Sequence, residues 1–467
     1  MSEYTEVEQP FLQQLQALGW TIIDQGPEIP KNPTKSLRRT FRQWLLPEVF
    51  AKGVAAINTT AAGEKWLTDK QLHELYDQIL RQPNRTLLEA NEAIQKLFFK
   101  AQVDANEITG EQDPVVKLID FANPENNQFH AINQFRIDTP SCVKQFIIPD
   151  IVLFVNGIPL AVVECKKGGP TCANPMHEAF EQLQRYMNKR EATKQQGLRE
   201  GEPHLFHPAL LLIRTCGLEA DFGTITSGIE HFFPWKTQWP GDESKAGAMN
   251  QQEQLISGML NKNNLLQILR TSSVFMDTDS GPRIKVVCRY QQFRAAGKIC
   301  DRLRTGKTQA EKSGVVWHTQ GSGKSLTMVF VARMMRVSKD LHDFKIVLIN
   351  DRLDLEEQLG RTATLIGGRV HIIESTSGLR SQLATDSSDI NMVMTHKFQQ
   401  REESLSLRVA EALGTYQAMP SGKTFGVVND SERIILMIDE AHRTQGSDLG
   451  DNIFEAFPNA VRIAFTG

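Results

Sequence analysis

The sequence predicts an α/β protein in two parts, a mixed sheet flanked by helices over residues 1–250 and a parallel α/β lobe over residues 251–467. Two β-rich apolar runs about 115 residues apart, at 315–325 and 433–442, end in polar residues, as buried parallel strands do. Nearer the N-terminus, two apolar runs flank an Asn-Gly dipeptide, which is a strong β-hairpin signal.

Composition indicates a large protein with real cores. The 467 residues are 40% hydrophobic and 23% charged, which excludes a disordered chain and suits two to four domains. A net charge of −3 means that any binding of nucleic acid relies on local basic patches. The six cysteines form no C-x-x-C pair, and no apolar stretch is long enough to span a membrane, so a reduced cytoplasmic setting is expected.

A turn-rich polar segment from Trp239 predicts a domain boundary near residue 250. The apolar spacing over 254–269 predicts one helix leading into the second part. Close to the N-terminus, Lys35 and Arg38 begin a basic cluster that would lie on a helix. That face would either contact phosphates or simply be solvated.

The predicted hairpin carries charged residues at the ends of its strands. Asp150 begins the first strand, and Glu164 and Lys166 end the second, on the same face because side chains alternate. Two carboxylates can bind Mg²⁺, and a neighbouring lysine can orient water or stabilise negative charge on a phosphate. The alternative is a surface hairpin with charged ends.

The register of this hairpin tests the idea. A simple two-residue turn would pair Asp150 with Val163 and place Asp150 and Glu164 on opposite faces of the sheet. A shared metal ion needs both carboxylates on one face. We therefore predict a three-residue loop or a β-bulge within the hairpin.

Flanking helices add candidate residues. Glu8 precedes a helical apolar spacing, and Asn174-Pro175 forms a predicted N-cap and first helical position. In the helix that follows, Gln182 and Tyr186 are four residues apart and share a face. Tyr186 would otherwise be a half-buried helix aromatic.

The second part contains a predicted phosphate loop. Gly321 and Gly323 allow the backbone N–H groups to face a phosphate, while Lys324 adds a charge and Ser325 a hydroxyl for Mg²⁺ at a helix N-terminus. A similar G-K-T at Gly306 follows a helical pattern, so we interpret that glycine as a helix C-cap.

A D-E-A-H sequence closes the second apolar run. Asp439 is placed to hold Mg²⁺ through water, and Glu440 to polarise an attacking water. The loop has His318 six residues before the lysine instead of glycine, which excludes the simplest kinase-like or GTPase-like pattern. Together the loop and the D-E-A-H box resemble superfamily 2 helicases and translocases. The nucleotide site implied by this resemblance comprises Gln292 as the adenine reader, Thr319, Gly321, Ser322, Gly323, Lys324, Ser325, Asp439 and His442.

The hairpin resembles PD-(D/E)xK nucleases, and Q-x-x-x-Y directly after it resembles the restriction subunit of type I restriction-modification enzymes. The resemblance implies a PD-(D/E)xK nuclease domain over 1–250, with Asp150 and Glu164 as Mg²⁺ ligands, followed by a RecA-like lobe. It also implies ATP-dependent translocation on double-stranded DNA coupled to Mg²⁺-dependent cleavage. ATP and Mg²⁺ are the implied cofactors, and methylation and specificity subunits the implied partners.

Two alternatives stay open. A type III restriction or repair nuclease-helicase shares the parts, although in type III subunits the nuclease follows the motor. A non-catalytic ATP-switched scaffold would keep Lys324 but tolerate loss of the carboxylates. Because the chain ends within what resembles motif III, we expect a fragment whose second motor lobe is missing.

Overall fold

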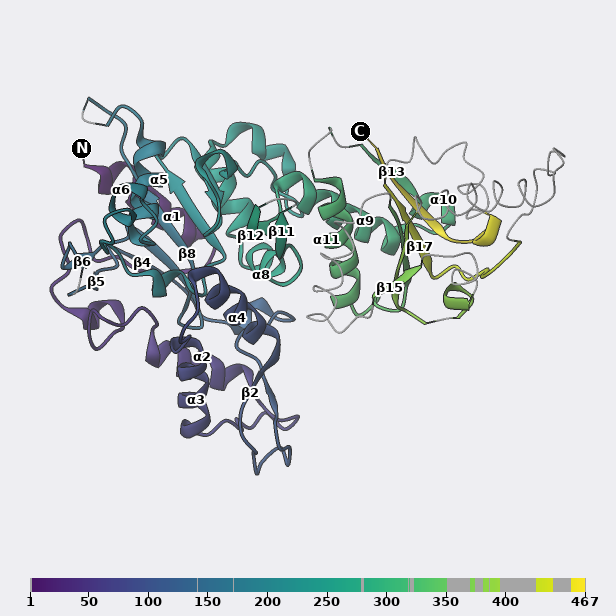
Figure 1. Cartoon of the computed structure of the whole chain (residues 1–467), viewed down its shortest axis with the longest axis horizontal. Helices are drawn as coiled ribbons and strands as arrows, with labels where there is room; N and C mark the ends of the chain where they lie inside the picture. The colour runs from purple at the N-terminus through teal and green to yellow at the C-terminus, as the bar shows by residue number, and fades with distance from the viewer. Residues whose placement is uncertain are drawn as a thin grey trace, which may run out of the picture. The chain divides into compact units, whose positions relative to one another are not determined.

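The computed structural model divides into two compact units, Met1–Tyr290 and Gln291–Gly467 (Figure 1). It describes residues 2–140, 142–170, 172–278, 281–317, 319, 323–350, 370–373, 381–385, 387–394, 426–439 and 455–466. No helix in these ranges is both long and apolar enough to cross a bilayer.

The first unit is built around a six-stranded mixed sheet. Its order is β1 (Thr21–Ile23), β4 (Phe129–Asn133), β7 (Ile151–Val155), β8 (Ile158–Cys165), β9 (Leu211–Thr215) and β10 (Ala220–Gly223). The pairs β1–β4 and β8–β9 are parallel, and the other neighbours are antiparallel. The mixed sheet predicted for this part is thus observed.

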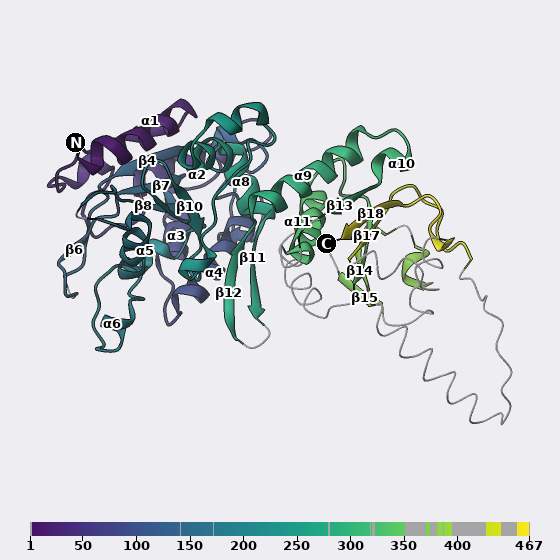
Figure 2. The same cartoon turned by 90° about the horizontal axis from the view of Figure 1, so that it is seen from above.

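Helices cover both faces of this sheet, with α1 (Gln9–Ala17) on one side of the strands and α5 (Pro175–Tyr186) on the other (Figure 2). A π-helical turn, η1 (Tyr4–Glu8), runs directly into α1. Every residue of β7 and β8 is buried. Burial on both faces explains why these strands read as continuous apolar runs rather than alternating ones.

The first unit also contains the following helices, helical turns and short strands, given in chain order. They are η2 (Pro33–Ser36), α2 (Pro47–Ile57), α3 (Asp69–Leu80), α4 (Leu87–Lys100), β2 (Ala101–Gln102), β3 (Val115–Val116), η3 (Pro124–Asn126), β5 (Ile137–Asp138), β6 (Phe146–Ile147), α6 (Glu191–Lys194), η4 (Pro203–Phe206), η5 (Ile229–His231), η6 (Glu243–Ala248), α7 (Gln251–Gln254), η7 (Leu255–Met259), α8 (Lys262–Thr271), β11 (Ser273–Thr278) and β12 (Gly281–Val287).

The single helix predicted over 254–269 is wrong. The chain leaves the helix at Leu260, whose carbonyl accepts a hydrogen bond from Trp20 Nε1, and restarts at α8 with Asn261 as N-cap. Lys285 of β12 then donates to Asn91 and to the carbonyl of Ala209, so residues 251–290 pack within the first unit. The domain boundary expected near residue 250 stays a prediction.

The basic cluster expected on a helix is also placed differently. The short η2 ends at Leu37, which has positive φ, and Arg38 turns inward, where it is 2% exposed. Its guanidinium lies 3.6 Å from the ring centroid of Phe135 and donates to the carbonyls of Gln43 and Arg136. Arg38 is therefore a structural residue that ties a loop to the core.

The second unit contains a six-stranded sheet in which every pairing is parallel. Its order is β13 (Gly314–Trp317), β18 (Val461–Thr466), β17 (Ile434–Ile438), β14 (Lys345–Asn350), β16 (Ile390–Met394) and β15 (Val370–Ile373). The helices α9 (Tyr290–Thr305), α10 (Gln309–Lys312) and α11 (Lys324–Val337) belong to this lobe. Gly306 follows the end of α9 and donates to the Arg302 carbonyl, as predicted for a C-cap. The predicted parallel α/β lobe is observed.

Candidate functional site

The hairpin contains the predicted bulge. Its register pairs Ile151 with Val163, then shifts by one residue after Leu153, so that Leu160 is the extra residue. The tip itself is a tight turn with positive φ at both Asn156 and Gly157. Extending the register by one residue from Ile151 sets Asp150 opposite Glu164. The prediction that the hairpin departs from a simple two-residue register is confirmed. Both carboxylates belong to one face of the sheet as a result.

Three charged groups meet at this end of the hairpin. Lys166 Nζ lies 2.7 Å from Glu164 Oε1 and 3.5 Å from Asp150 Oδ2. Asp150 Oδ2 also accepts the backbone N–H of Cys165 at 2.7 Å. Glu164 is 1% and Asp150 7% exposed. The structure thus brings together the three residues predicted to form the nuclease site.

Burial dominates the electrostatics of this cluster. Desolvation raises the pKa of Asp150, and desolvation together with Asp150 raises the pKa of Glu164 well above its usual range. Burial alone would lower the pKa of Lys166, but Glu164 and Asp150 outweigh it and the pKa rises. The lysine is therefore held in its charged form as the counter-ion of the carboxylates.

Glu8 extends the acidic cluster from the helical side. Its side chain is 2% exposed. Gln134 Nε2 donates a hydrogen bond of 3.1 Å to each of the two carboxylate oxygens of Glu8. Desolvation, with a contribution from Asp150, raises its pKa to about 7. The resemblance to PD-(D/E)xK nucleases implies an accessory acidic residue on a helix near the site; that role for the candidate Glu8 stays a prediction, and the electrostatic effect of Asp150 on Glu8 agrees with it.

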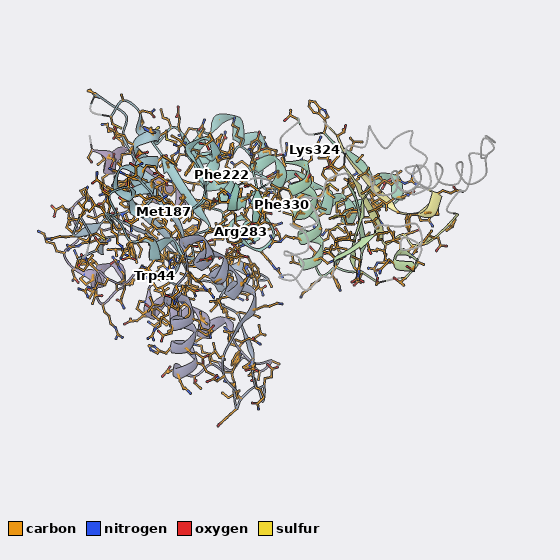
Figure 3. All side chains as sticks on the ribbon, in the orientation of Figure 1. Trp44, Met187, Phe222, Arg283, Lys324 and Phe330 are labelled. Atoms are coloured by element: carbon orange, nitrogen blue, oxygen red, sulfur yellow. The ribbon has the colours of Figure 1, made fainter. Side chains whose placement is uncertain are left out.

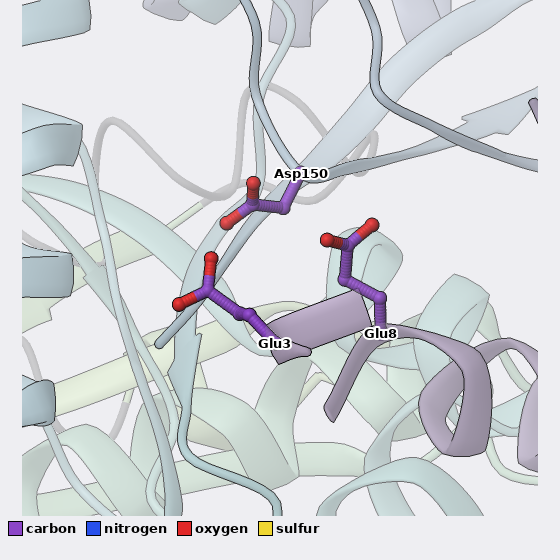
Figure 4. Close-up of side chains that lie close together, drawn as sticks. All are labelled: Glu3, Glu8 and Asp150. Carbon is purple, nitrogen blue, oxygen red and sulfur yellow. The ribbon is translucent and has the colours of Figure 1, made fainter. Parts of the chain in front are cut away.

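Sequence reasoning missed Glu3. The carboxylates of Glu3, Glu8 and Asp150 offer oxygens within 4.8 Å of one another (Figure 4). On an α-helix, residues five apart differ by about 140° around the axis. Here the π-turn, closed by the Gln9 N–H donating to the Tyr4 carbonyl, brings Glu3 and Glu8 to the same side. Only a signal for the π-turn could have identified Glu3.

Gln182 and Tyr186 support the same end of the sheet. Tyr186 is 1% exposed, its hydroxyl donates to the Ile148 carbonyl at 2.8 Å, and Gln182 Nε2 donates to that hydroxyl at 2.9 Å. Desolvation, followed by Glu164 and Asp150, raises the pKa of Tyr186 well above its usual range. The hydroxyl therefore stays protonated and fixes the strand entry two residues before Asp150.

The donor set fits a hard divalent cation. All candidate ligands are carboxylate oxygens, as Mg²⁺ prefers. Glu164 Oε2 is enclosed and has no hydrogen-bond partner among the residues that the structure describes. An orphaned buried carboxylate oxygen is costly unless a cation or proton meets it. Asp150 and Glu164 could accordingly hold a metal ion, with Glu3 and Glu8 close by.

The second unit assembles part of the predicted nucleotide site. Gly323, with φ of 80°, is the N-cap of α11, and Lys324 begins the helix (Figure 3). Gln292 is 3% exposed, and its Nε2 donates to the Gly323 carbonyl at 3.1 Å. The predicted adenine reader therefore contacts the end of the phosphate loop. Thr319 is exposed.

The two predicted phosphate motifs meet across neighbouring elements. Ser325 Oγ at the start of α11 lies 3.4 Å from Asp439 Oδ2, directly after β17. Parallel strands deliver their C-terminal ends to one edge, which brings residues 114 positions apart into contact. The predicted site residues Gly321, Ser322, Glu440 and His442 lie outside the described residues.

Comparison with known proteins identifies the family. Residues 1–241, just over half of the chain, match the model of the type I restriction enzyme R protein N terminus. The chain belongs to this family. Residues 291–467 match the SWI2/SNF2 ATPase model, so the parallel lobe is an ATPase domain of that kind.

Curated relatives of this chain carry corresponding names. The HindI endonuclease subunit of Haemophilus influenzae, a type I restriction enzyme, is 28% identical over 491 residues. A proposed type I restriction enzyme endonuclease subunit of Methanocaldococcus jannaschii, MjaIXP, is 26% identical over 487 residues. Each alignment covers 100% of the chain and 42% of the relative, so the chain spans less than half the length of these curated relatives.

Proposed function

We propose that the chain supplies the nuclease and the first motor lobe of a type I restriction subunit. In this proposal ATP-driven translocation on double-stranded DNA is coupled to Mg²⁺-dependent cleavage, in complex with methylation and specificity subunits. The observation that carries it is the bulged hairpin, because its register puts Asp150, Glu164 and Lys166 on one face. A surface hairpin with charged ends would not need two buried carboxylates.

The nuclease half would work as a PD-(D/E)xK site. Asp150 and Glu164 would hold Mg²⁺, which supplies Lewis-acid stabilisation of the scissile phosphate and lowers the pKa of a bound water. Lys166, already held charged by the carboxylates, would stabilise negative charge that develops on the phosphate. Gln182 and Tyr186 would fix the backbone that carries Asp150.

The motor half would bind ATP at the N-terminus of α11. Lys324 would contact the terminal phosphates, and Ser325 and Asp439 would hold the Mg²⁺ of ATP between them. Gln292 would recognise adenine, and Glu440 would polarise the attacking water. His442 and the loop residues Thr319, Gly321 and Ser322 would complete the site.

A reciprocal pair of variants tests the proposal in a complex reconstituted from the whole restriction subunit that would carry this chain, together with methylation and specificity subunits. Asp150→Ala should abolish Mg²⁺-dependent cleavage, by a factor on the order of 10³ or more, and leave DNA-stimulated ATP hydrolysis within about twofold. Lys324→Ala should abolish ATP hydrolysis, and cleavage with it, because remote cutting requires translocation. Normal cleavage by the Asp150→Ala enzyme, with its expression and folding intact, would overturn the nuclease assignment.

A further inference from the structure

A buried arginine precedes Tyr186, whose hydroxyl contacts the strand entry before Asp150, and it has no counter-charge in contact among the described residues. Arg185 of α5 is 6% exposed, and its enclosed Nε has no hydrogen-bond partner in the part of the chain that the structure describes. Within the described part of the chain, no carboxylate or carbonyl forms an ion pair or hydrogen bond with its guanidinium. The ring of Tyr186 lies against it, with 5.0 Å between Cζ and the ring centroid. Burying a cation in this way is unfavourable unless an anion compensates it.

The other deeply buried arginines of this unit have hydrogen-bond partners for their guanidinium groups. Arg214 forms two hydrogen bonds of 2.7 Å with the carboxylate of Asp221. Arg38 donates to two carbonyls and to the Ser36 hydroxyl, although its Nη2 has no partner among the described residues. Arg185 differs from both, because no hydrogen bond or ion pair of its guanidinium is found within the described part of the chain.

Two loops bring further cations to this position. The backbone N–H of Val143 donates to the Arg199 carbonyl at 2.8 Å, which joins the loop before β6 to the loop after α6. Gly201 passes so close to the end of α5 that a Cβ there would lie 2.1 Å from the Tyr186 carbonyl oxygen. Lys144 belongs to the first of these loops, and Arg190 is the N-cap of α6, at the start of the short helix that leads into the second.

The neighbouring charges affect the pKa of Lys144. Arg185 is the largest cause of a lowered pKa at Lys144; burial and Arg190 act in the same direction, and Glu200 opposes them. Glu200 is itself engaged, by Arg190 Nε at 3.6 Å and by the Thr193 hydroxyl at 2.7 Å. Glu200 therefore serves Arg190 and Lys144, and within the described residues no ion pair joins it to Arg185.

We propose that Arg185, together with Lys144 and Arg190, binds a backbone phosphate of the DNA next to the scissile one. The proposal rests on the nuclease function proposed above. A guanidinium presents a planar fork of donors that matches two phosphate oxygens, and Arg185 is oriented for it by the ring beneath. Tyr186 links the cluster to the strand entry before Asp150, so a phosphate held here positions the duplex at the metal site.

Binding of a fluorescein-labelled 20-base-pair duplex by the 467-residue chain tests the proposal, with Ca²⁺ in place of Mg²⁺ and anisotropy as the readout. Arg185→Gln should weaken binding about tenfold at low salt and lower the slope of log Kd against log salt by about 1, the signature of one lost phosphate contact. Arg185→Lys, which keeps the charge but not the fork, should lie between. Arg81→Gln is the matched control, because Arg81 is an exposed arginine of the same unit.

Lys144→Gln provides a second test that does not depend on whether the Arg185 variants fold. Lys144 is exposed, so its replacement should leave the thermal unfolding curve unchanged and still lower the salt slope. Wild-type affinity and slope for Arg185→Gln, or no duplex binding by the unmodified chain, would overturn the phosphate site. Cleavage by the reconstituted Asp150→Ala complex instead contradicts the nuclease assignment, whatever the Arg185 result.

Discussion

The two candidate sites are built in different ways. In the first unit, Asp150, Glu164 and Lys166 come from one hairpin, and the lysine compensates part of the negative charge of the two carboxylates within the protein. In the second unit, Ser325 and Asp439 come from elements far apart in the chain and approach to 3.4 Å. The first site thus has an internal counter-ion before any ligand binds, whereas the described part of the second site pairs a hydroxyl with a carboxylate.

The difference teaches which residues matter for stability as well as for chemistry. A lysine that is the counter-ion of buried carboxylates is required for the folded state, because its loss leaves negative charge without compensation. A lysine that binds a phosphate at a helix N-terminus, the role proposed for Lys324, is expected to contribute mainly when the ligand is present. The following predictions test this contrast, from the largest expected effect to the smallest.

Lys166→Met should lower the free energy of unfolding of the first unit by about 3–5 kcal/mol without divalent cations at pH 8, as expected when a buried ion pair loses one partner. Lys324→Met should cost the second unit less than half as much and should abolish its stabilisation by ATP. Urea unfolding followed by circular dichroism and limited proteolysis measures both. Equal losses of unfolding free energy in the two variants would show that the two lysines do not differ in their contribution to stability.

The stability of the metal-free first unit should depend on pH through Glu8. Its folded pKa of about 7 lies above the ordinary value, so the folded state binds the proton more tightly. The stabilisation is complete below about pH 4.5 and is lost as pH rises to about 7, by roughly 1–3 kcal/mol. Asp150 and Glu164, whose pKa values are also raised, act in the same direction.

Glu8→Gln should flatten part of this pH dependence, as measured by denaturant unfolding from pH 4.5 to 8. A divalent cation competes with the proton for these carboxylates. Adding Mn²⁺ should therefore reduce the loss of folding stability that the unmodified chain shows at neutral pH. A variant with an unchanged pH profile would mean that Glu8 does not titrate in this range.

Glu3→Gln should weaken binding of Mn²⁺ to the first unit about tenfold, since losing a nearby carboxylate commonly costs 10–100-fold in metal affinity. Isothermal titration calorimetry measures the effect. Glu6→Gln is the matched control on the same π-turn, because Glu6 pairs with Lys167 and lies outside the acidic cluster. Equal effects of the two variants would show that only overall charge matters.

Tyr186→Phe should have the smallest effect. It removes the hydrogen bond to the Ile148 carbonyl and the acceptor for Gln182, which should cost about 1–2 kcal/mol of stability. Cleavage by the reconstituted complex should fall by less than about tenfold, since the hydroxyl only positions the strand. Tyr4→Phe, which removes an exposed hydrogen bond to Asp24, provides the control.

Much of both sites follows from local sequence periodicity. The alternation of side chains along a strand fixes the face of each residue, so the need for Asp150 and Glu164 on one face predicted a three-residue loop or a bulge, and the structure has a bulge at Leu160. Likewise, apolar runs ending in polar residues predicted that the phosphate loop and the D-E-A-H sequence lie at one edge of the sheet, where Ser325 and Asp439 approach to 3.4 Å.

The tertiary structure alone decided which distant groups meet and which charges lack a partner. Glu3 joins the acidic cluster because a π-turn changes the helical period, and the helix expected over 254–269 is interrupted at Leu260, whose carbonyl accepts a hydrogen bond from Trp20. Arg185 and Arg38 look alike in the sequence, yet the guanidinium of Arg38 donates to two carbonyls and a hydroxyl, whereas that of Arg185 forms no hydrogen bond among the described residues. Periodicity encodes local geometry, whereas the compensation of a buried charge depends on every element that packs around it.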